Sequence, residues 1–316
     1  MTTEVKNEAL ETEKATKTAT IYDTPAYKPR KRKLGDRRDG RKLRTLDGLH
    51  VATPFVMKDR NDSCNQFEEE VNIGKADEFV RQQLMAGNEG FSMLHVILAA
   101  YVRAISQYPY LNRFVSGQRI FARNKVEVLM VVKKSLSMDA PETSINVIFD
   151  PRDTVYDVYA RFNEQVTRAT STENETDNIT GFFRNFPRFL FRAVVSAVKA
   201  LDYFGLCPKI LTESLPFWGS MIITSMGSLG IKPIYHHLYN LGNLPVFISY
   251  GTKRKIYELD KHGNVNLKKI IDLKVVTDER TCDGFQYATA FKAFKKYVEN
   301  PEILTTPPEK VIEDID

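Results

Sequence analysis

Residues 277–284 read Thr-Asp-Glu-Arg-Thr-Cys-Asp-Gly, and this short segment decides how the rest of the chain is interpreted. It follows the run Asp272–Thr277, whose β-branched and apolar residues are typical of a strand. After it, apolar side chains recur at steps of four, three and four, which predicts a helix: Tyr287, Phe291, Phe294 and Val298. An acidic residue followed by glycine, as at Asp283-Gly284, can fix a sharp backbone turn. The segment therefore predicts a strand, a tight loop and an amphipathic helix in succession.

Upstream of this segment, helical and strand periodicities are mixed along the chain. Apolar side chains at three- and four-residue steps predict a helix over 91–108, which Pro109 ends. Thr154 with Asp157 resembles a capping box that opens another helix. Strands are predicted over 120–133 in two runs, 143–150, 221–224 and 245–250, and a long amphipathic stretch over 187–204. This order, without regular βαβ alternation, predicts an α/β sandwich with a mixed sheet.

Three segments in order resemble the chloramphenicol acetyltransferase and dihydrolipoamide acyltransferase superfamily. Residues 279–284 and the helix after them resemble its C-terminal signature, His-x-x-x-Asp-Gly. Ile223–Ile231 resembles its Ile-Ser-Asn-Leu-Gly-x-x-Gly-Val segment, and Tyr108–Asn112 resembles its helix-terminating Pro-x-Leu-Asn. The intervals fit over residues 46–304. The resemblance implies a chloramphenicol acetyltransferase-like α/β sandwich, as in the catalytic domains of 2-oxo acid dehydrogenase acyltransferases.

The resemblance also implies a chemistry, acyl transfer between a coenzyme A thioester and a second nucleophile such as a thiol. In the family, the motif histidine is the general base and a hydroxyl in the glycine-rich segment stabilises the oxyanion. By position, Thr224 is the expected hydroxyl donor, Asp283 organises the motif turn, and Ser225 and Gly227 belong to substrate binding. The family further implies a homotrimer with sites between subunits, whose interface would bury part of the apolar surface of 182–206.

The histidine position of the motif holds Glu279 in this chain. A glutamate carboxyl has an ordinary pKa of about 4.3 against about 8.5 for a thiol, so it is a weak base for a thiol unless burial raises its pKa. His236 and His237 follow the glycine-rich segment by a few residues and are alternative bases. The non-catalytic interpretations are a glutamate paired with an arginine such as Arg280 and a structural histidine pair. A catalytically silent binding or scaffold protein, a pseudoenzyme, therefore stays open beside the enzyme.

The positive charge of the chain is concentrated near the N-terminus. The net charge is +5 over 316 residues, yet residues 28–44 alone contribute +8, so the remainder carries −3. A slightly acidic body is not typical of a nucleic-acid-binding domain, and we expect no nucleic-acid partner. We expect a flexible basic leader over 1–45, an acyltransferase-like catalytic domain over 46–304 and an acidic tail over 305–316.

Several classes of site and location are excluded by composition. Cys64, Cys207 and Cys282 lie far apart, which predicts no disulfide framework and no metal site, and favours a reducing, cytoplasmic location. The most apolar stretches carry too many charged residues to cross a membrane. We find no lipoyl-type hairpin ahead of residue 46, so we expect a free-standing protein without a covalently attached lipoyl group, which uses coenzyme A as a substrate.

The stretch 181–206 places Arg184, Arg188 and Arg192 at four-residue intervals among aromatic and aliphatic side chains. A basic amphipathic helix of this kind can lie on an anionic membrane or cover a partner subunit. For a fold of this type we favour packing against a subunit, and peripheral membrane contact is the alternative that we do not favour.

Overall fold

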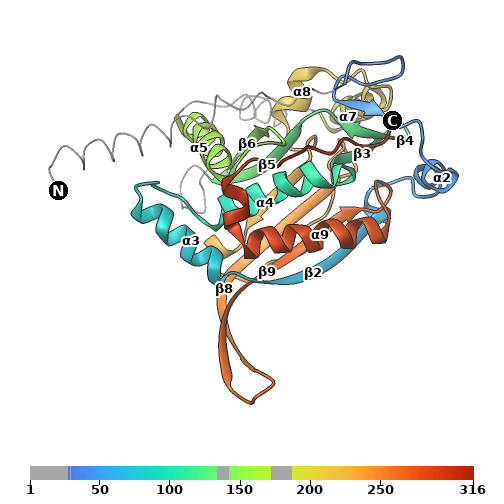
Figure 1. Cartoon of the computed structure of the whole chain (residues 1–316). Coiled ribbons are helices and arrows are strands. Elements are labelled where there is room, and N and C mark those ends of the chain that lie inside the picture. Colours follow the sequence, from blue (N-terminus) through green and yellow to red (C-terminus); the bar gives the residue numbers. More distant parts are fainter. Residues whose placement is uncertain (1–27, 29, 134–141, 172–186) are drawn as a thin grey trace.

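The computed structural model describes residues 28, 30–133, 142–171 and 187–316 (Figure 1). The helices are α2 (Gly48–Val56), α3 (Gly74–Met85), α4 (Met93–Gln107), α5 (Val155–Ser171), α7 (Arg188–Tyr203), α8 (Lys209–Ser214) and α9 (Gly284–Glu299). The strands are β1 (Gly40–Lys42), β2 (Cys64–Asn72), β3 (Arg113–Ser116), β4 (Arg119–Arg123), β5 (Val126–Lys133), β6 (Glu142–Phe149), β7 (Met221–Ser225), β8 (Val246–Leu259) and β9 (Val265–Asp278). The predicted helices and strands are present, and β8 is longer than predicted because it continues into a hairpin with β9.

Six of these strands form the main sheet, in the order β2-β9-β8-β7-β5-β6. Strand β7 runs parallel to β5 and β8, and the other neighbours in this sheet are antiparallel. The predicted mixed sheet is therefore confirmed. A second, three-stranded antiparallel sheet, β1-β4-β3, lies beside it.

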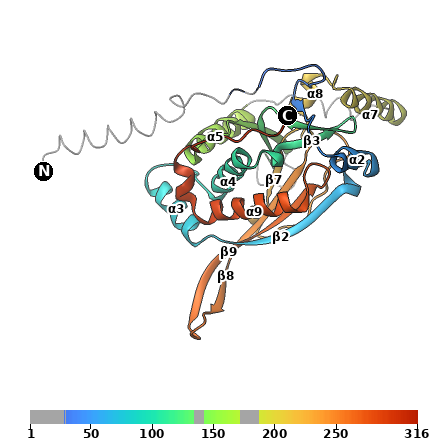
Figure 2. The same cartoon turned by 45° about the vertical axis from the view of Figure 1, so that its right-hand side comes forward.

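One face of the main sheet is covered by helices α3, α4, α5 and α9, as Figures 1 and 2 show. Alternation along β7 places Met221 and Ile223 in the apolar core beneath these helices. Helix α4 is buried from Met93 to Ser106, because it lies between the sheet and its neighbouring helices. The central strands therefore direct every second side chain into this packed interior. We call this side of the sheet the inner face.

The opposite, outer face of the sheet is only partly covered. The loop 231–245 packs Leu238 and Leu244 on side chains that β7 and β8 direct to this face, Ile222 and Phe247. Toward the β6 edge, apolar side chains such as Val131 and Ile148 remain exposed. Thr224 lies two residues beyond Ile222 and therefore also belongs to the outer face.

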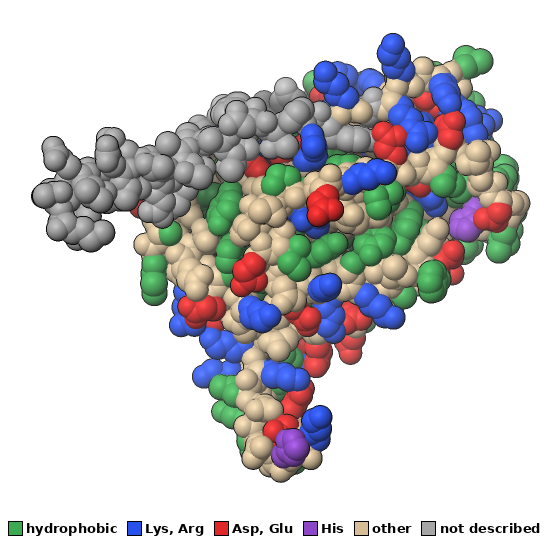
Figure 3. All heavy atoms as spheres, in the orientation of Figure 1, with side chains coloured by type: hydrophobic (Ala, Val, Ile, Leu, Met, Phe, Trp, Pro, Cys, Tyr) green, Lys and Arg blue, Asp and Glu red, His purple; other side chains and the backbone are tan. Residues whose placement is uncertain are grey.

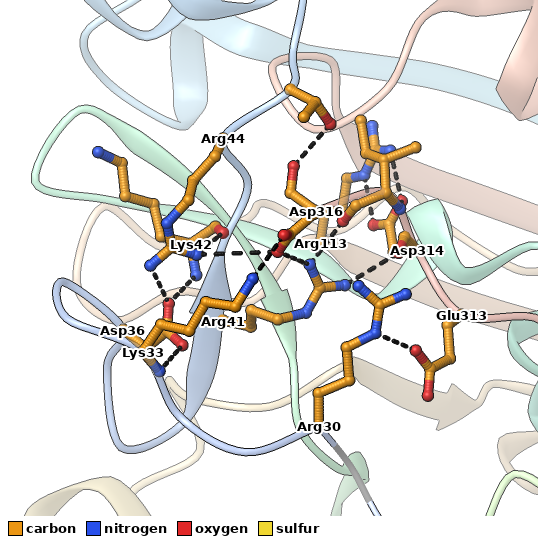
Figure 4. A network of polar contacts seen from close by, with 12 residues as sticks. Arg30, Lys33, Asp36, Arg41, Lys42, Arg44, Arg113, Glu313, Asp314 and Asp316 are labelled. Atoms are coloured by element: carbon orange, nitrogen blue, oxygen red, sulfur yellow. Dashed lines mark hydrogen bonds and ion pairs between the residues drawn. The ribbon is translucent and has the colours of Figure 1, made fainter.

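The ends of the described chain differ from the flexible leader and tail that we expected. Gly40–Lys42 form β1, which pairs with β4, and Asp314 is buried against Arg113. Basic side chains of 30–44 meet acidic side chains of 313–316, for example Lys33 Nζ and Asp316 at 2.6 Å (Figure 4). The expected boundaries at residues 45 and 305 therefore do not mark the edges of the ordered structure, because charge pairing holds these two segments together. The prediction for residues 1–27 lies outside the described residues.

The predicted amphipathic stretch at 187–204 forms helix α7 near one end of the molecule (Figure 1). Its expected continuation over 181–186 lies outside the described residues. Among the described helices, α7 included, none combines the length and the apolar character that a bilayer-spanning helix requires.

Candidate functional site

The motif turn connects the end of β9 to the start of α9, as the sequence predicted. Asp283 is the N-cap of α9, and its carboxylate accepts a hydrogen bond from the Gln286 backbone N–H at 2.8 Å. In return, the Gln286 side-chain oxygen accepts from the Asp283 N–H at 3.2 Å. This reciprocal pair satisfies two backbone donors that the helix start leaves without intrahelical partners. Asp283 thus sets where the helix begins and how the turn enters it.

A buried cluster of charges holds the other end of the motif turn. Arg280 donates from Nε to Asp278 Oδ1 and from Nη2 to Oδ2, both at 2.8 Å, and Arg60 Nε lies 3.4 Å from Asp278 Oδ2. Burial lowers the pKa of Arg60 below its ordinary value. Burial also opposes the charge of Arg280, but the closer hydrogen bonds and charge of Asp278 raise its pKa overall. Both guanidinium groups remain charged, so two cations balance the negative charge of Asp278 inside the protein.

Glu279 takes no part in this cluster. Its backbone N–H donates to the Ser63 carbonyl at 2.8 Å, while its side chain is exposed. Arg280, the ion-pair partner considered from the sequence, binds Asp278 instead. Within the described residues Glu279 forms no ion pair. The burial that a glutamate base requires is therefore not supplied by its own chain.

Arg113 joins the motif turn to the C-terminal segment (Figure 4). It donates from Nε and Nη2 to the Asp314 carboxylate, at 2.7 Å and 2.6 Å, and from Nη1 to the Thr281 carbonyl at 3.3 Å. The Thr281 hydroxyl in turn donates to the Asp278 carbonyl at 2.8 Å. The turn is thus fixed by contacts to segments that lie far away in the sequence, which the spacing of residues did not reveal.

The glycine-rich segment follows β7 on the outer face. Ser225 caps its loop locally, since the Ser225 carbonyl accepts from the Ser228 hydroxyl at 2.7 Å. A Cβ added at Gly227 would lie 2.5 Å from the Gly251 carbonyl oxygen, so only glycine allows this loop to approach β8. The contacts of Ser225 and Gly227 within this chain therefore shape the loop, and Thr224 lies half-buried at the end of β7.

His236 lies in the loop that covers the outer face. Its ring stacks on Phe247 with centroids 4.3 Å apart and an interplanar angle of 4°. The Nε2 atom is buried and has no hydrogen-bond partner among the described residues. Burial, and secondarily His237, lowers the pKa of His236, so the ring is neutral at pH 7. His237 is exposed.

The strand register shows which of these residues lie together in one chain. Thr224 pairs with Ser249 and Ile222 pairs with Phe247, so the His236 ring stacks about 7 Å along the strands from the Thr224 row. The Ile234 N–H, two residues before His236, donates to the Ser249 hydroxyl at 3.4 Å. The covering loop therefore brings His236 and Thr224 to the same part of the outer face.

Glu279 is remote from this place within one chain. Ser249 pairs with Lys274 of β9, and Glu279 lies five residues further along, about 17 Å in the strand direction. Within one chain the structure thus places Thr224 nearer to His236 than to Glu279.

A polar hollow of about 360 Å³ lies beside the motif turn. It is lined by the cations Lys58, Arg60, Lys199 and Arg280 and by two acids, Asp59 and Asp202. Arg60 and Arg113 could not be recognised from the sequence, because isolated arginines far from the motif carry no recognisable spacing. Among the described residues, no group of three or more His, Cys, Asp or Glu side chains could hold a metal ion.

Comparison with solved structures bears on the fold. A probable dihydrolipoamide acetyltransferase from Listeria monocytogenes 4b F2365 matches with a TM-score of 0.50 and 13% identity, over 82% of this chain and 95% of that one. The truncated catalytic core of the 2-oxoacid dehydrogenase multienzyme complex from Thermoplasma acidophilum matches with a TM-score of 0.50 and 15% identity, over 82% and 99%. A chloramphenicol acetyltransferase matches with a TM-score of 0.48 and 12% identity, over 81% and 99%.

No protein-family model matches the chain, and no curated protein sequence matches it. The structural matches nevertheless confirm the fold that the three sequence segments predicted, an acyltransferase-like α/β sandwich.

Proposed function

We propose that this chain is a free-standing, coenzyme A-dependent acyltransferase of the 2-oxo acid dehydrogenase type, which passes an acyl group to a thiol or a related acceptor. The observation that carries the proposal is that Thr224 and His236 lie on the same outer face of a sheet with the acyltransferase fold, about 7 Å apart along the strands. A hydroxyl donor and a neutral imidazole that both reach one acyl group can catalyse thioester exchange.

The proposed chemistry uses each side chain in the protonation state described above. Neutral His236 takes the proton from the acceptor thiol as the thiol sulfur attacks the thioester carbonyl. The Thr224 hydroxyl donates a hydrogen bond to the tetrahedral oxyanion. The carbon–sulfur bond to coenzyme A then breaks, and His236 returns the proton to the departing thiolate. Acyl group, proton and charge are balanced, so no further reactant is required.

In this proposal the phosphates of coenzyme A bind in the hollow beside the motif turn. Lys58, Lys199, Arg60 and Arg280 line that hollow, and phosphate groups are bound by cations of this kind. The two arginines are buried and donate to Asp278 and to backbone carbonyls, so the exposed Lys58 and Lys199 are the cations that would meet a phosphate. No covalently attached lipoyl group is part of this proposal.

We further propose that the protein is a homotrimer with sites between subunits, in the cytoplasm. Support comes from the separation of Thr224 and Glu279 in one chain, since a second copy could bring its own Glu279 to Thr224. In that arrangement Glu279 of the second copy is the alternative base to His236. The three free cysteines are in keeping with a reducing compartment.

The test is the rate of acyl transfer from acetyl-CoA to dihydrolipoamide and to other thiols, with coenzyme A binding measured separately by calorimetry. Turnover above the uncatalysed rate with at least one acceptor is the expected result. Binding of coenzyme A without turnover across the acceptors would remove the enzymatic proposal. A stable monomer in light scattering at micromolar concentration would remove the trimer and leave the chemistry at His236.

A catalytically silent binding or scaffold protein is the second candidate. One observation favours it, the exposed position of Glu279 where the family has its base. If the protein is catalytically silent, Glu279→Gln and changes at His236 should leave the rate of acyl transfer at the uncatalysed rate. Glu279→His should then create transfer by restoring an imidazole of ordinary pKa about 6.5.

A further inference from the structure

Helix α7 leaves large apolar side chains exposed. Phe189 and Phe204 are 78% and 72% exposed, and Leu190 and Leu201 are each more than one third exposed. Within the described residues, no side chain of α7 belongs to an apolar core cluster. An amphipathic helix normally gains its stability by burying its apolar face, so this face is available to something outside the described chain.

The helix is held to the body by a polar anchor near its C-terminal end. Asp202 accepts from Arg37 Nη2 and from Trp218 Nε1, both at 3.1 Å, and the Asp202 carbonyl accepts from the Ser116 hydroxyl at 2.9 Å. The Tyr203 hydroxyl donates to the Gln118 side chain at 3.1 Å. This anchor sets the position of α7, while Phe189, Leu190 and Leu201 stay exposed.

Cations and apolar residues occupy opposite sides of α7. Arg188, Arg192 and Lys199 recur at steps of four and seven, which places them in one stripe along the helix. A second stripe, at steps of four, three and four on the opposite side, is apolar and consists of Leu190, Val194, Ala197 and Leu201. Basic residues on one face and bulky apolar residues on the other are the pattern of helices that lie in the plane of a membrane surface.

A basic hollow of about 430 Å³ continues this surface beyond the helix. Phe204 and Leu206, both strongly exposed, lie at its rim, and its lining includes Arg32, Arg38 and Arg119. Lys and Arg side chains gather over this end of the molecule with hydrophobic side chains among them, as the upper right of Figure 3 shows. Apolar groups flanked by arginines match the acyl-chain boundary and the phosphates of an anionic bilayer.

We propose that this surface, α7 with Phe204 and Leu206 and the adjoining arginine hollow, docks on an anionic phospholipid membrane. Its arginines complement phosphate headgroups, and the apolar side chains beside them match the acyl-chain boundary of a bilayer. The inference does not depend on the acyl-transfer proposal. It requires only that the protein can rest on a bilayer with its acyltransferase-like sheet on the aqueous side.

The test is cosedimentation of the full chain with phosphatidylcholine vesicles, with and without a quarter of phosphatidylglycerol. We expect binding to the anionic vesicles, and weaker binding at high salt because salt screens the charges. Replacing two cations, in an Arg188→Gln and Arg192→Gln variant, should lower the partition coefficient about 10–30-fold. A Leu190→Glu and Leu201→Glu variant should lose binding, because it removes apolar contact and adds negative charge.

The matched control is Leu259→Glu with Leu267→Glu, which makes the same change at two exposed leucines of the β8–β9 hairpin. This control should bind vesicles as the unaltered chain does. No binding of the unaltered chain to anionic vesicles would overturn the proposal. Binding that persists in the Leu190→Glu and Leu201→Glu variant would overturn it too, since the basic segment 28–44 would then be the attachment. Loss of an oligomer in light scattering for that variant would instead identify the face as a subunit contact.

Discussion

The two halves of the candidate site are built in opposite ways. The motif turn, 277–284, is fixed by buried ions: Asp278 lies between Arg60 and Arg280, and Arg113 ties the turn to Asp314. The candidate base of this half, Glu279, is exposed. The outer-face half, 224–238, has few buried charges, yet it holds a half-buried neutral histidine on Phe247 near the end of β7. In this chain the rigid half and the half suited to proton transfer are different segments.

This difference shows that the backbone of the motif turn does not depend on the residue at the histidine position. The cap at Asp283 and the ion pairs of Asp278 determine the backbone, and neither depends on the side chain at position 279. A base, by contrast, needs an environment that holds it in the neutral or basic form near its substrate. The covering loop stacks the His236 ring on Phe247, and its burial there favours the neutral form.

The largest expected effect separates the two halves as sources of the base. If His236 is the base, His236→Gln should lower the rate of the chemical step about 10²–10⁴-fold, and Glu279→Gln should be mild. Steady-state rates of acyl transfer over pH 5–9 check this. Because burial lowers the pKa of His236, the rate of the unaltered protein should fall only below pH 6.5, as the ring becomes protonated.

His237→Gln is the control for this experiment, because His237 is the exposed neighbour and should be nearly neutral. The reverse result, a severe Glu279→Gln and a mild His236→Gln, would assign the base to the motif half. An active protein indifferent to all three changes would exclude both assignments.

The next effect concerns the rigidity of the motif half. Asp314→Ala leaves the buried Arg113 guanidinium without its bidentate partner, so the free energy of unfolding should fall by about 3–5 kcal/mol. Urea unfolding measures this change. Glu313→Ala is the neighbouring control: its ion pair with Arg30 is largely exposed and should contribute about 0–1 kcal/mol. Equal effects for the two variants would show that the buried pair does not support the turn.

Glycines in the two halves should respond differently to an added methyl group. In Gly227→Ala the new Cβ meets the backbone of Gly251, so we expect a loss of about 1–3 kcal/mol in unfolding free energy. In Gly284→Ala the new Cβ meets nothing within 4 Å, and alanine at the first turn of α9 should be neutral or stabilise by up to about 1 kcal/mol. Thermal unfolding of both variants checks the comparison. A destabilising Gly284→Ala would mean that the motif glycine has a steric role of its own.

The smallest effect tests the cap of the motif helix. Asp283→Ala removes the acceptor of the Gln286 N–H and should lower the unfolding free energy by about 1 kcal/mol, while Asp283→Asn should be nearly neutral. Denaturant midpoints of the two variants measure this. If Asp283→Asn abolished acyl transfer while the fold stayed intact, Asp283 would have a role in the site beyond capping.

Part of this architecture could be predicted from the sequence because it depends on neighbours in the chain. The periodicity of α4 and α9, the β-branched runs of β6 and β9 and the Asp283-Gly284 turn are local patterns, and each formed the element it predicted. The three motif segments 108–112, 223–231 and 279–284, in that order, predicted the sandwich. The mixture of helical and strand periodicities predicted its mixed sheet.

Other features were decided only when the chain folded. The pairing of Arg113 with Asp314 joins residues 201 positions apart, and no spacing rule predicts which of many arginines meets which acid. Strand β1 is a second example. The basic composition of 28–44 predicted a flexible leader, whereas β1 forms by pairing with β4, which lies far away in the sequence. Strand register likewise decided that His236 lies near Thr224 and that Glu279 lies far from it. Local patterns specify elements because their causes lie within a few residues, whereas distances between side chains depend on how those elements pack.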